Sequence, residues 1–232
     1  QDFRLSERQI ARKVKELKGK KVIFLGDSIT EGAAASRPEN VFHQHVKRTL
    51  GLAEAVNCGV GGTRIARQTA ASVLPAYDAD FNRRAQELDA DADLVVVFGG
   101  TNDFGHGDAP LGKWGDDTIY TFYGACRALF CTLLEKYGKE KIVTVTPLHR
   151  VGEENPFGDG SKRIASAPLK DYVAAILKTA ESMGIRTLDL WEDTQLNPNL
   201  AGNERFFADG LHPTDEGHAL LGSKLAYYLS QL

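Results

Sequence analysis

Cysteine is scarce in this sequence, with three residues among 232. An odd and small number excludes a framework in which every cysteine is paired in a disulfide, and it favours a reducing compartment. We therefore expect a cytoplasmic location, while an extracytoplasmic location stays open because a leader could have been trimmed. Long apolar runs are also lacking, since no stretch approaches the roughly 18 apolar residues that a membrane helix needs. The sequence thus predicts no membrane span.

An excess of positive charge is lacking too. Lysine and arginine total 28 against 31 aspartate and glutamate, which gives a formal net charge of −3. This balance favours no nucleic-acid partner. No spacing of His, Cys and acidic residues is typical of a zinc site. Neither a Gly-x-x-x-x-Gly-Lys-Ser/Thr loop nor a Gly-x-Ser-x-Gly elbow is present. The sequence therefore gives no motif for a metal, for a nucleotide or for an ordinary α/β-hydrolase.

The composition is that of a globular protein, with 42% hydrophobic and 25% charged residues. These values exclude a disordered, collagen-like or coiled-coil chain. The length suits one α/β domain, and no low-complexity linker interrupts it. We expect a single domain over residues 1–232. A basic amphipathic helix within residues 1–19, over 5–18, is expected to pack on it.

Short apolar runs alternate with helical patterns along the chain. The runs predict five buried strands, over residues 21–26, 55–58, 94–98, 142–145 and 187–190. Helical patterns occur near residues 40–50, 78–89, 118–137 and 168–183. A last helix follows Pro213, with Thr214 as its N-cap and His218 on its surface. This alternation predicts an α/β fold with a mostly parallel sheet and helices on both faces.

Polar and glycine-rich segments follow the first three strands, at the edge where open α/β sheets bind ligands. Ser28 comes directly after the first strand and is a candidate nucleophile, although a lone serine there more often caps the next helix. Glycines between Gly59 and Gly62 let backbone N–H groups approach an oxyanion or a phosphate. After the third strand, Asn102 is able to donate its side-chain amide to an oxyanion, with an Asx turn as the alternative explanation.

Asp209 precedes His212 by three residues in a turn stiffened by Pro213. A carboxylate at this spacing is able to fix the tautomer of the imidazole, which leaves the other ring nitrogen free to act as a base toward a hydroxyl. For this pair alone, a surface turn is the alternative. Because all four segments follow strands or lie in loops that can converge on one crevice, together they favour nucleophilic catalysis.

In their order along the chain these segments resemble the blocks of the SGNH or GDSL hydrolases, from Gly26-Asp27-Ser28 to Asp209-x-x-His212. Ile29 stands where the common motif has Leu. The resemblance covers nearly the whole chain. It implies a three-layer α/β/α sandwich of flavodoxin-like type with about five parallel strands. It also implies that Ser28 is the nucleophile, that His212 is its general base and that Asp209 orients His212.

The same resemblance implies an oxyanion hole. Its donors would be the backbone N–H groups of Ser28 and Gly62 and the side-chain amide of Asn102. Gly62 is chosen because it stands five residues after Asn57, as in the family's second block. Gly61 remains open, since several glycines in this segment allow more than one alignment.

The function that the resemblance implies is a serine esterase that forms and hydrolyses an acyl-enzyme, with no metal or organic cofactor. Loops 104–115 and 147–167 lack a long apolar stretch for a fatty acyl chain. We therefore expect a small-molecule or carbohydrate ester substrate with a short acyl group such as acetyl, and Phe104 and Trp114 as stacking faces for a sugar. Alternatives are a general carboxylesterase, a lysophospholipase, a thioesterase, an acyltransferase and, in a different class, a catalytically inactive carbohydrate- or acyl-binding module.

Further residues beside the motifs are candidates for substrate contact or for support of the site: Asp27, Thr63, Arg64, Asp103, Phe104, His106 and His149. We expect Asp27 and Asp103 to brace the loops by hydrogen bonds rather than to take part in the chemistry. A solvated side chain is the alternative for Arg64. For His106 and His149, which lie in or beside the long loops, the alternative is a loop histidine with no role in the site.

Overall fold

The computed structural model describes residues 16–232, so the predicted helix over 5–18 lies outside the described residues except at its last positions. Its centre is a sheet of five parallel strands in the order β2-β1-β3-β4-β5. The strands are β1 (Lys21–Gly26), β2 (Glu54–Gly59), β3 (Leu94–Phe98), β4 (Ile142–Val145) and β5 (Arg186–Leu188). This is the order of flavodoxin-like doubly wound sheets, and it confirms the predicted fold class.

Strands β1, β3 and β4 begin and end where the apolar runs predict, because these strands are buried on both faces. Strand β5 ends two residues earlier than predicted. The backbone beyond Leu188 bonds to side chains instead of to the sheet. The N–H of Leu190 donates to the Thr146 hydroxyl at 2.8 Å, and the N–H of Trp191 donates to the Asp189 carboxylate at 3.0 Å.

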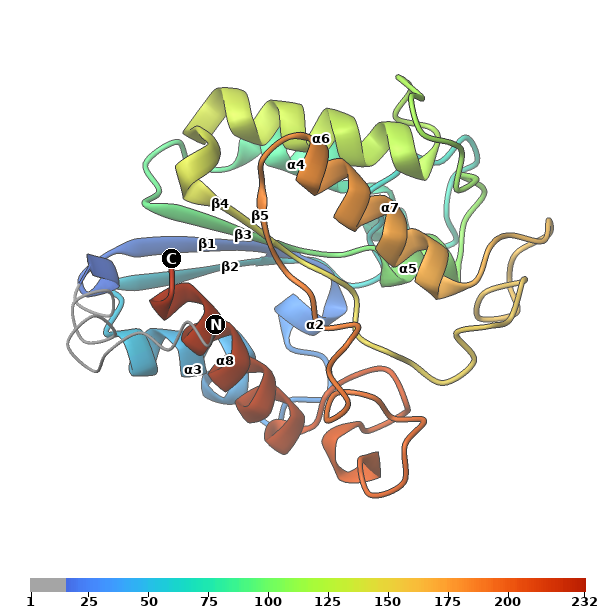
Figure 1. Cartoon of the computed structure of the whole chain (residues 1–232). Helices are drawn as coiled ribbons and strands as arrows, with labels where there is room; N and C mark the ends of the chain where they lie inside the picture. Colours follow the sequence, from blue (N-terminus) through green and yellow to red (C-terminus); the bar gives the residue numbers. More distant parts are fainter. Residues whose placement is uncertain (1–15) are drawn as a thin grey trace, which may run out of the picture.

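Two layers of helices cover the sheet (Figure 1). Successive residues of a central strand point to opposite faces. Ile23 and Val95 therefore belong to one apolar cluster, with α4, α6 and α7, and Phe24 and Val96 belong to the other, with α3 and α8. The covering helices are α3 (Phe42–Leu50), α4 (Phe81–Glu87), α6 (Phe122–Tyr137), α7 (Leu169–Ser182) and α8 (Asp215–Ser230).

Helix α8 begins after Thr214, whose hydroxyl accepts the N–H of Gly217 at 3.3 Å. The prediction that His218 lies on the surface of this helix is wrong, because its side chain is fully buried against α3. The N–H of Phe42 donates to its Nδ1 at 3.3 Å, and the two rings stack. Gly222, one turn further along α8, allows this close approach, since a Cβ there would lie 2.8 Å from the Phe42 carbonyl oxygen.

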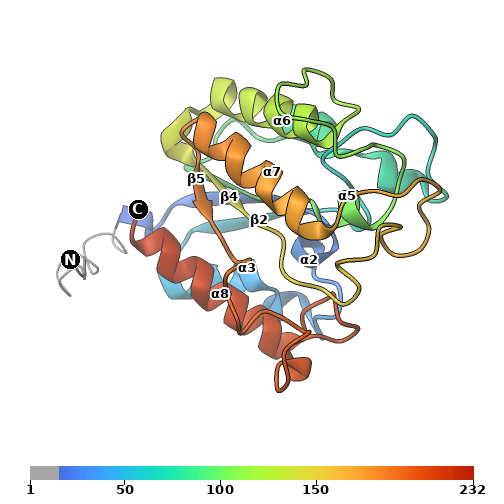
Figure 2. The same ribbon diagram turned by 45° about the vertical axis from the view of Figure 1, so that its right-hand side comes forward.

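The carboxyl end of the sheet carries two short helices, α2 (Ser28–Glu31) after β1 and α5 (Thr101–Gly105) after β3. These two strands are neighbours at the point where the strand order reverses, which is where open α/β sheets bind ligands. The connections after β2, α5 and β4 are long, and they extend from this same end (Figure 2). Within residues 16–232, no helix is long and apolar enough to cross a membrane.

Candidate active site

Ser28 is the first residue of α2, two positions after β1 ends. A glycine is required at position 26 because a Cβ there would overlap the hydroxyl of Thr30. Asp27 caps α2, and its carboxylate accepts the N–H of Ile29 at 3.0 Å. The turn leaves Ser28 at a crevice. The backbone N–H of Ser28 has no acceptor among residues 16–232.

His212 and Asp209 occupy the tight turn that precedes α8. The Ser28 hydroxyl oxygen lies 2.9 Å from His212 Nε2, and His212 Nδ1 lies 2.6 Å from Asp209 Oδ2. The second oxygen of the Asp209 carboxylate accepts the backbone N–H groups of Leu211 at 3.0 Å and of His212 at 2.7 Å. The hydroxyl, the imidazole and the carboxylate therefore form one continuous chain of hydrogen bonds.

The Asp209 side chain is 54% exposed, and its carboxylate is ionised near pH 7. Partial burial by itself would raise its pKa. Hydrogen bonds from the backbone and ring of His212, and from Leu211, outweigh this effect and hold the pKa of Asp209 below its usual value. An ionised carboxylate accepts Nδ1–H of a neutral imidazole, which leaves Nε2 free to take a proton from Ser28.

The two glycines that the sequence could not separate differ in their hydrogen bonds. The N–H of Gly61 donates to the carboxylate of Glu31 at 2.9 Å. The N–H of Gly62 has no acceptor within the described part of the chain. Gly62 has φ +72°, and the Tyr77 ring lies where a Cβ would stand. Sequence reasoning missed Glu31, although it lies one helical turn after Ser28.

Asn102 and Asp103 lie next to each other in α5, and both are buried. The Asn102 side-chain amide donates one hydrogen to the carbonyl oxygen of Thr63 at 3.0 Å. The Asp103 carboxylate accepts the N–H groups of Ile65 at 2.9 Å and of Ala66 at 2.8 Å. Burial raises the pKa of Asp103 to about 7, against the effect of these two hydrogen bonds. Both side chains thus fix the loop after β2 to α5.

A single crevice of about 1440 Å³ contains Ser28, Gly62, Asn102 and His212 in its lining. Residues 60–80, 106–121 and 146–168, the connections after β2, α5 and β4, supply much of its wall. Among residues 16–232, no group of three or more His, Cys, Asp or Glu side chains is placed to hold a metal ion.

The arrangement of these residues along the chain is that of a known family. The model of the GDSL-like lipase/acylhydrolase family matches residues 24–220. The chain belongs to this family. Its members act on ester bonds, and this protein is accordingly an ester-bond hydrolase. No sequence among the curated proteins matches the chain.

Solved structures share the fold. A protein from Lactobacillus plantarum is 28% identical, with a TM-score of 0.78 over 92% of this chain and 98% of that chain. An acetyl xylan esterase is 23% identical, with a TM-score of 0.60 over 88% of this chain and 97% of its own. A two-domain esterase active on acetylated mannans is 21% identical, with a TM-score of 0.60, and the match covers 97% of this chain but 52% of that chain.

A buried arginine of this GDSL-family hydrolase supports the site, and sequence reasoning missed it. From α4, Arg84 donates to the carbonyl oxygens of Gly26 at 3.0 Å and Cys58 at 2.7 Å, at the ends of β1 and β2. It also donates to the hydroxyl of Thr63 at 2.7 Å. Thr63 is fully buried and is absent from the crevice lining. Its side chain therefore supports the loop and does not contact a substrate.

Arg64 and His106 do line the crevice. The alternative of a solvated Arg64 is wrong, because the residue is 2% exposed. Its guanidinium contacts His106 Nδ1 at 3.1 Å and donates to the Ser72 hydroxyl at 2.6 Å and the Asp78 carboxylate at 3.2 Å. Burial, together with the charge of Arg64, lowers the pKa of His106 to about 4. His106 is therefore neutral near pH 7.

The aromatic residues expected to stack on a sugar lie elsewhere. Phe104 is 1% exposed, and its ring packs edge-on against Tyr172 in the core between α5 and α7. Trp114 is half-exposed but does not line the crevice, and the Lys178 ammonium lies over its ring at 4.6 Å. The prediction that these two side chains face a substrate is wrong. The short helix after β3 turns Phe104 inward.

His149 is likewise outside the crevice lining, so its prediction as a crevice residue is wrong. Its ring stacks on Trp191 with the ring centres 3.7 Å apart. One ring nitrogen contacts the Glu153 carboxylate at 2.9 Å, and the other contacts the Trp191 carbonyl oxygen at 2.8 Å. Both ring nitrogens are thus used by the chain itself, one within the loop after β4 and the other to join this loop to the segment after β5.

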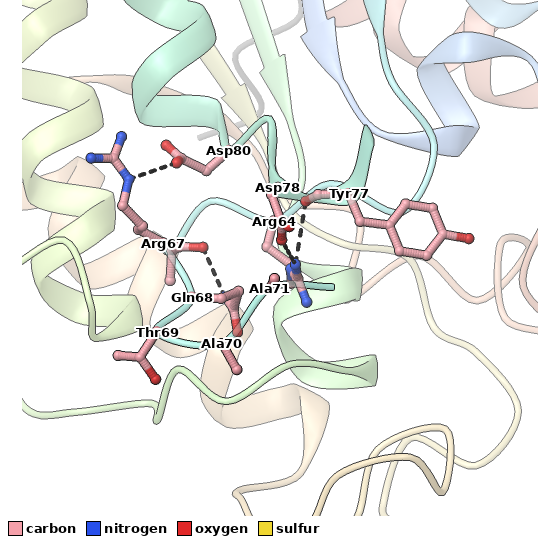
Figure 3. Close-up of a pocket in the computed structure, with 10 residues that line it drawn as sticks. Arg64, Arg67, Gln68, Thr69, Ala70, Ala71, Tyr77, Asp78 and Asp80 are labelled. Carbon is pink, nitrogen blue, oxygen red and sulfur yellow. Dashed lines mark hydrogen bonds and ion pairs between the residues drawn. The ribbon is translucent and has the colours of Figure 1, made fainter. Parts of the chain in front are cut away.

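A smaller cavity of about 240 Å³ adjoins the crevice, and Arg64 and Tyr77 line both. Figure 3 shows that its charged side chains are paired with one another. Arg64 lies 3.2 Å from the Asp78 carboxylate, and Arg67 lies 2.9 Å from the Asp80 carboxylate. This cavity therefore has both of its guanidinium groups neutralised by the chain itself.

Proposed function

We propose that this protein is a serine esterase in which Ser28, His212 and Asp209 carry the reaction. The observation that supports it is the hydrogen-bonded chain from the Ser28 hydroxyl through His212 to Asp209, with steps of 2.9 Å and 2.6 Å. Ser28 Oγ attacks the ester carbonyl while its proton passes to His212 Nε2. That proton then goes to the leaving alcohol. Water, deprotonated by His212, hydrolyses the acyl-enzyme and restores Ser28.

The oxyanion of the tetrahedral intermediate would accept three hydrogen bonds. The donors are the N–H groups of Ser28 and Gly62, which have no acceptor within residues 16–232, and the remaining amide hydrogen of Asn102. The bond from Gly61 to Glu31 favours Gly62 over Gly61 as the second donor. Donors already held in position stabilise the transition state without reorganisation, and each contributes about 3 kcal/mol.

For the substrate we propose a short acyl ester, such as an acetate, of a carbohydrate or another polar alcohol. The polar side chains along the crevice, among them His106, Arg150 and Lys162, suit a polar alcohol. Two structures with the same fold, the acetyl xylan esterase and the esterase active on acetylated mannans, act on acetylated polysaccharides. A protein that had become a binding module would not need the intact set Ser28, Asn102 and His212.

A second candidate is an ester with a large apolar group. Val73 and Ile164, which also line the crevice, are 97% and 82% exposed. Such side chains at a crevice would contact the apolar part of a carboxylester, a lysophospholipid or a thioester. The length of the acyl chain that is hydrolysed fastest separates the two candidates.

The test is hydrolysis of p-nitrophenyl esters from acetate to octanoate by wild type and by Ser28→Ala. We expect the highest kcat/KM on acetate and a fall with each longer chain. Ser28→Ala should lose at least about 1000-fold in kcat because the nucleophile is gone. The circular dichroism spectrum should be unchanged. A rise toward octanoate would favour the apolar candidate. Turnover by Ser28→Ala close to that of wild type would contradict the assignment of the nucleophile.

A further inference from the structure

Two cationic side chains in the crevice lack a counter-ion. Arg150 and Lys162, both from the connection between β4 and α7, line the crevice and are 9% and 7% exposed. Neither has a carboxylate within 4.0 Å among residues 16–232. A buried charge without a partner is costly, because the surrounding protein replaces water poorly.

Arg150 also keeps unused hydrogen-bond donors. Its Nη1 donates to the carbonyl oxygen and the hydroxyl of Thr101 at 3.3 Å and 3.2 Å. In the described part of the chain its Nε is buried without a partner, and its Nη2 has no acceptor. The carboxylates that act on it at longer range include Asp159 and Asp209.

The other arginines around the crevice differ from Arg150 in their partners. Arg64 and Arg67 are each paired with an aspartate in the smaller cavity (Figure 3). Arg84 has no carboxylate partner, but it donates to three carbonyl oxygens and one hydroxyl of the chain itself. Among the buried arginines of residues 16–232 that lie at this crevice, Arg150 is thus the one that has neither a carboxylate partner nor an acceptor for each of its nitrogens.

The backbone next to Arg150 lies beside the turn that carries His212. The N–H of the next residue, Val151, donates to the carbonyl oxygen of Gly210 at 2.9 Å, within the turn between Asp209 and His212. In the proposed reaction His212 passes its proton to the leaving alcohol. Because the Arg150 side chain begins beside this turn and lines the crevice, we assign it to the part of the crevice that receives the alcohol.

From these observations we propose that the enzyme selects esters whose alcohol part carries a carboxylate. Arg150 supplies the counter-charge for this carboxylate, because the Lys162 ammonium already donates to the Asp103 carbonyl oxygen at 2.7 Å and to the Tyr172 hydroxyl at 3.2 Å. Guanidinium and carboxylate are complementary in shape and charge, and such pairs form strong hydrogen bonds. This inference rests on the proposed esterase function and narrows its substrate class.

The test compares two acetates of similar shape, 3-acetoxybenzoate, which is anionic, and 3-acetoxybenzamide, which is neutral. At low salt we expect the kcat/KM of wild type to be about tenfold higher for the anionic ester, as one hydrogen bond to a charged group can supply. The preference should weaken at high salt. Equal kcat/KM for the two esters would overturn the inference while leaving the esterase function intact.

Variants locate the preference. In Arg150→Gln the ratio of the two kcat/KM values should fall to about one, and Arg150→Lys, which keeps the charge, should retain part of it. Arg163→Gln is the matched control, because Arg163 lines the same crevice but is exposed. Its ratio should change by less than about twofold. The role of Arg150 would be contradicted if Arg150→Gln kept the preference of wild type for the anionic ester. It would also be contradicted if Arg163→Gln lost this preference to the same extent as Arg150→Gln.

A binding measurement separates this inference from the proposed reaction. Calorimetry with 3-hydroxybenzoate and 3-hydroxybenzamide, the alcohols released from the two esters, requires no turnover. We expect the benzoate to bind wild type about tenfold more tightly than the benzamide. Arg150→Gln should lose this difference. If neither ester is hydrolysed but the benzoate still binds preferentially, the esterase function fails and the anion site stands. Equal binding of the two alcohols would refute the anion site.

Discussion

At the scale of single residues, burial decides which groups of this protein are charged. It raises the pKa of Asp27, which caps α2 beside the nucleophile, to about 6, against the effects of the Ile29 N–H and the charges of His212 and Arg84. It lowers the pKa of His218 to about 4. His218 thus remains neutral at a pH where an exposed histidine would be protonated.

A pH dependence of stability follows from His218. Its pKa is about 4 in the folded protein and near 6.5 in the unfolded chain. Above pH 6.5 this histidine is neutral in both the folded and the unfolded chain. As the pH falls below 6.5 the unfolded chain binds a proton that the folded protein does not, and this stabilises the unfolded chain and lowers the free energy of unfolding. Between about pH 7.5 and about pH 5, wild type should lose about 2 kcal/mol of unfolding free energy through this residue.

The measurement is urea unfolding at both pH values for wild type and His218→Asn. The amide of asparagine is able to accept the Phe42 N–H as the imidazole does, but it does not titrate. His218→Asn should not lose the part of the unfolding free energy that wild type loses through His218 on acidification. The other titrating groups contribute equally to the pH dependence of both proteins. An identical loss of stability in the two proteins would contradict a neutral, buried His218.

The sequence was sufficient to select the candidate residues whose positions follow from strand ends, and insufficient for those whose direction depends on packing. Ser28 and Asn102 each follow a strand that an apolar run marks. Phe104 and His218 were misplaced because only the contacts of α5 and α8 show which side of each helix is buried. Arg150 could not be singled out, since its lack of a counter-ion exists only in the folded chain.

At the scale of elements, α4 supports the site through one side chain. Arg84 joins the carboxyl ends of β1 and β2 by its bonds to Gly26 and Cys58. The helical pattern over 78–89 predicts α4, but not that an arginine lies on its buried face. The end of β5 could not be predicted from the sequence for a similar reason. It depends on the hydroxyl of Thr146, which lies in the connection after β4 and binds the N–H of Leu190.

Arg84→Met should destabilise the protein by about 3 kcal/mol or more, because four acceptors lose a buried donor. It should also lower kcat by about tenfold or more, since Ser28 and Gly62 follow the strands that Arg84 joins. Arg83→Met is the control on the same helix, as the Arg83 side chain is 63% exposed. Thermal unfolding and ester hydrolysis measure both effects. Equal losses in the two variants would contradict the supporting role of Arg84.

At the scale of the whole molecule, the sheet order places the site. The order reverses between β1 and β3, and Ser28, which follows β1, meets His212 in the turn before α8 across a sequence separation of 184 residues. The fold class follows from the alternation of strands and helices. The shape of the crevice wall does not follow from this alternation, because it depends on how three long loops pack together.

Labelling with a fluorophosphonate, followed by mass spectrometry of the peptides, tests most directly whether Ser28 is the nucleophile. We predict one adduct, on Ser28, and a loss of esterase activity in proportion to labelling. His212→Ala should react at least about 100-fold more slowly because the base is missing. Ser72 and Ser161 line the same crevice and serve as internal comparisons. An adduct on either of them instead of Ser28, or full activity after Ser28 is labelled, would contradict the account.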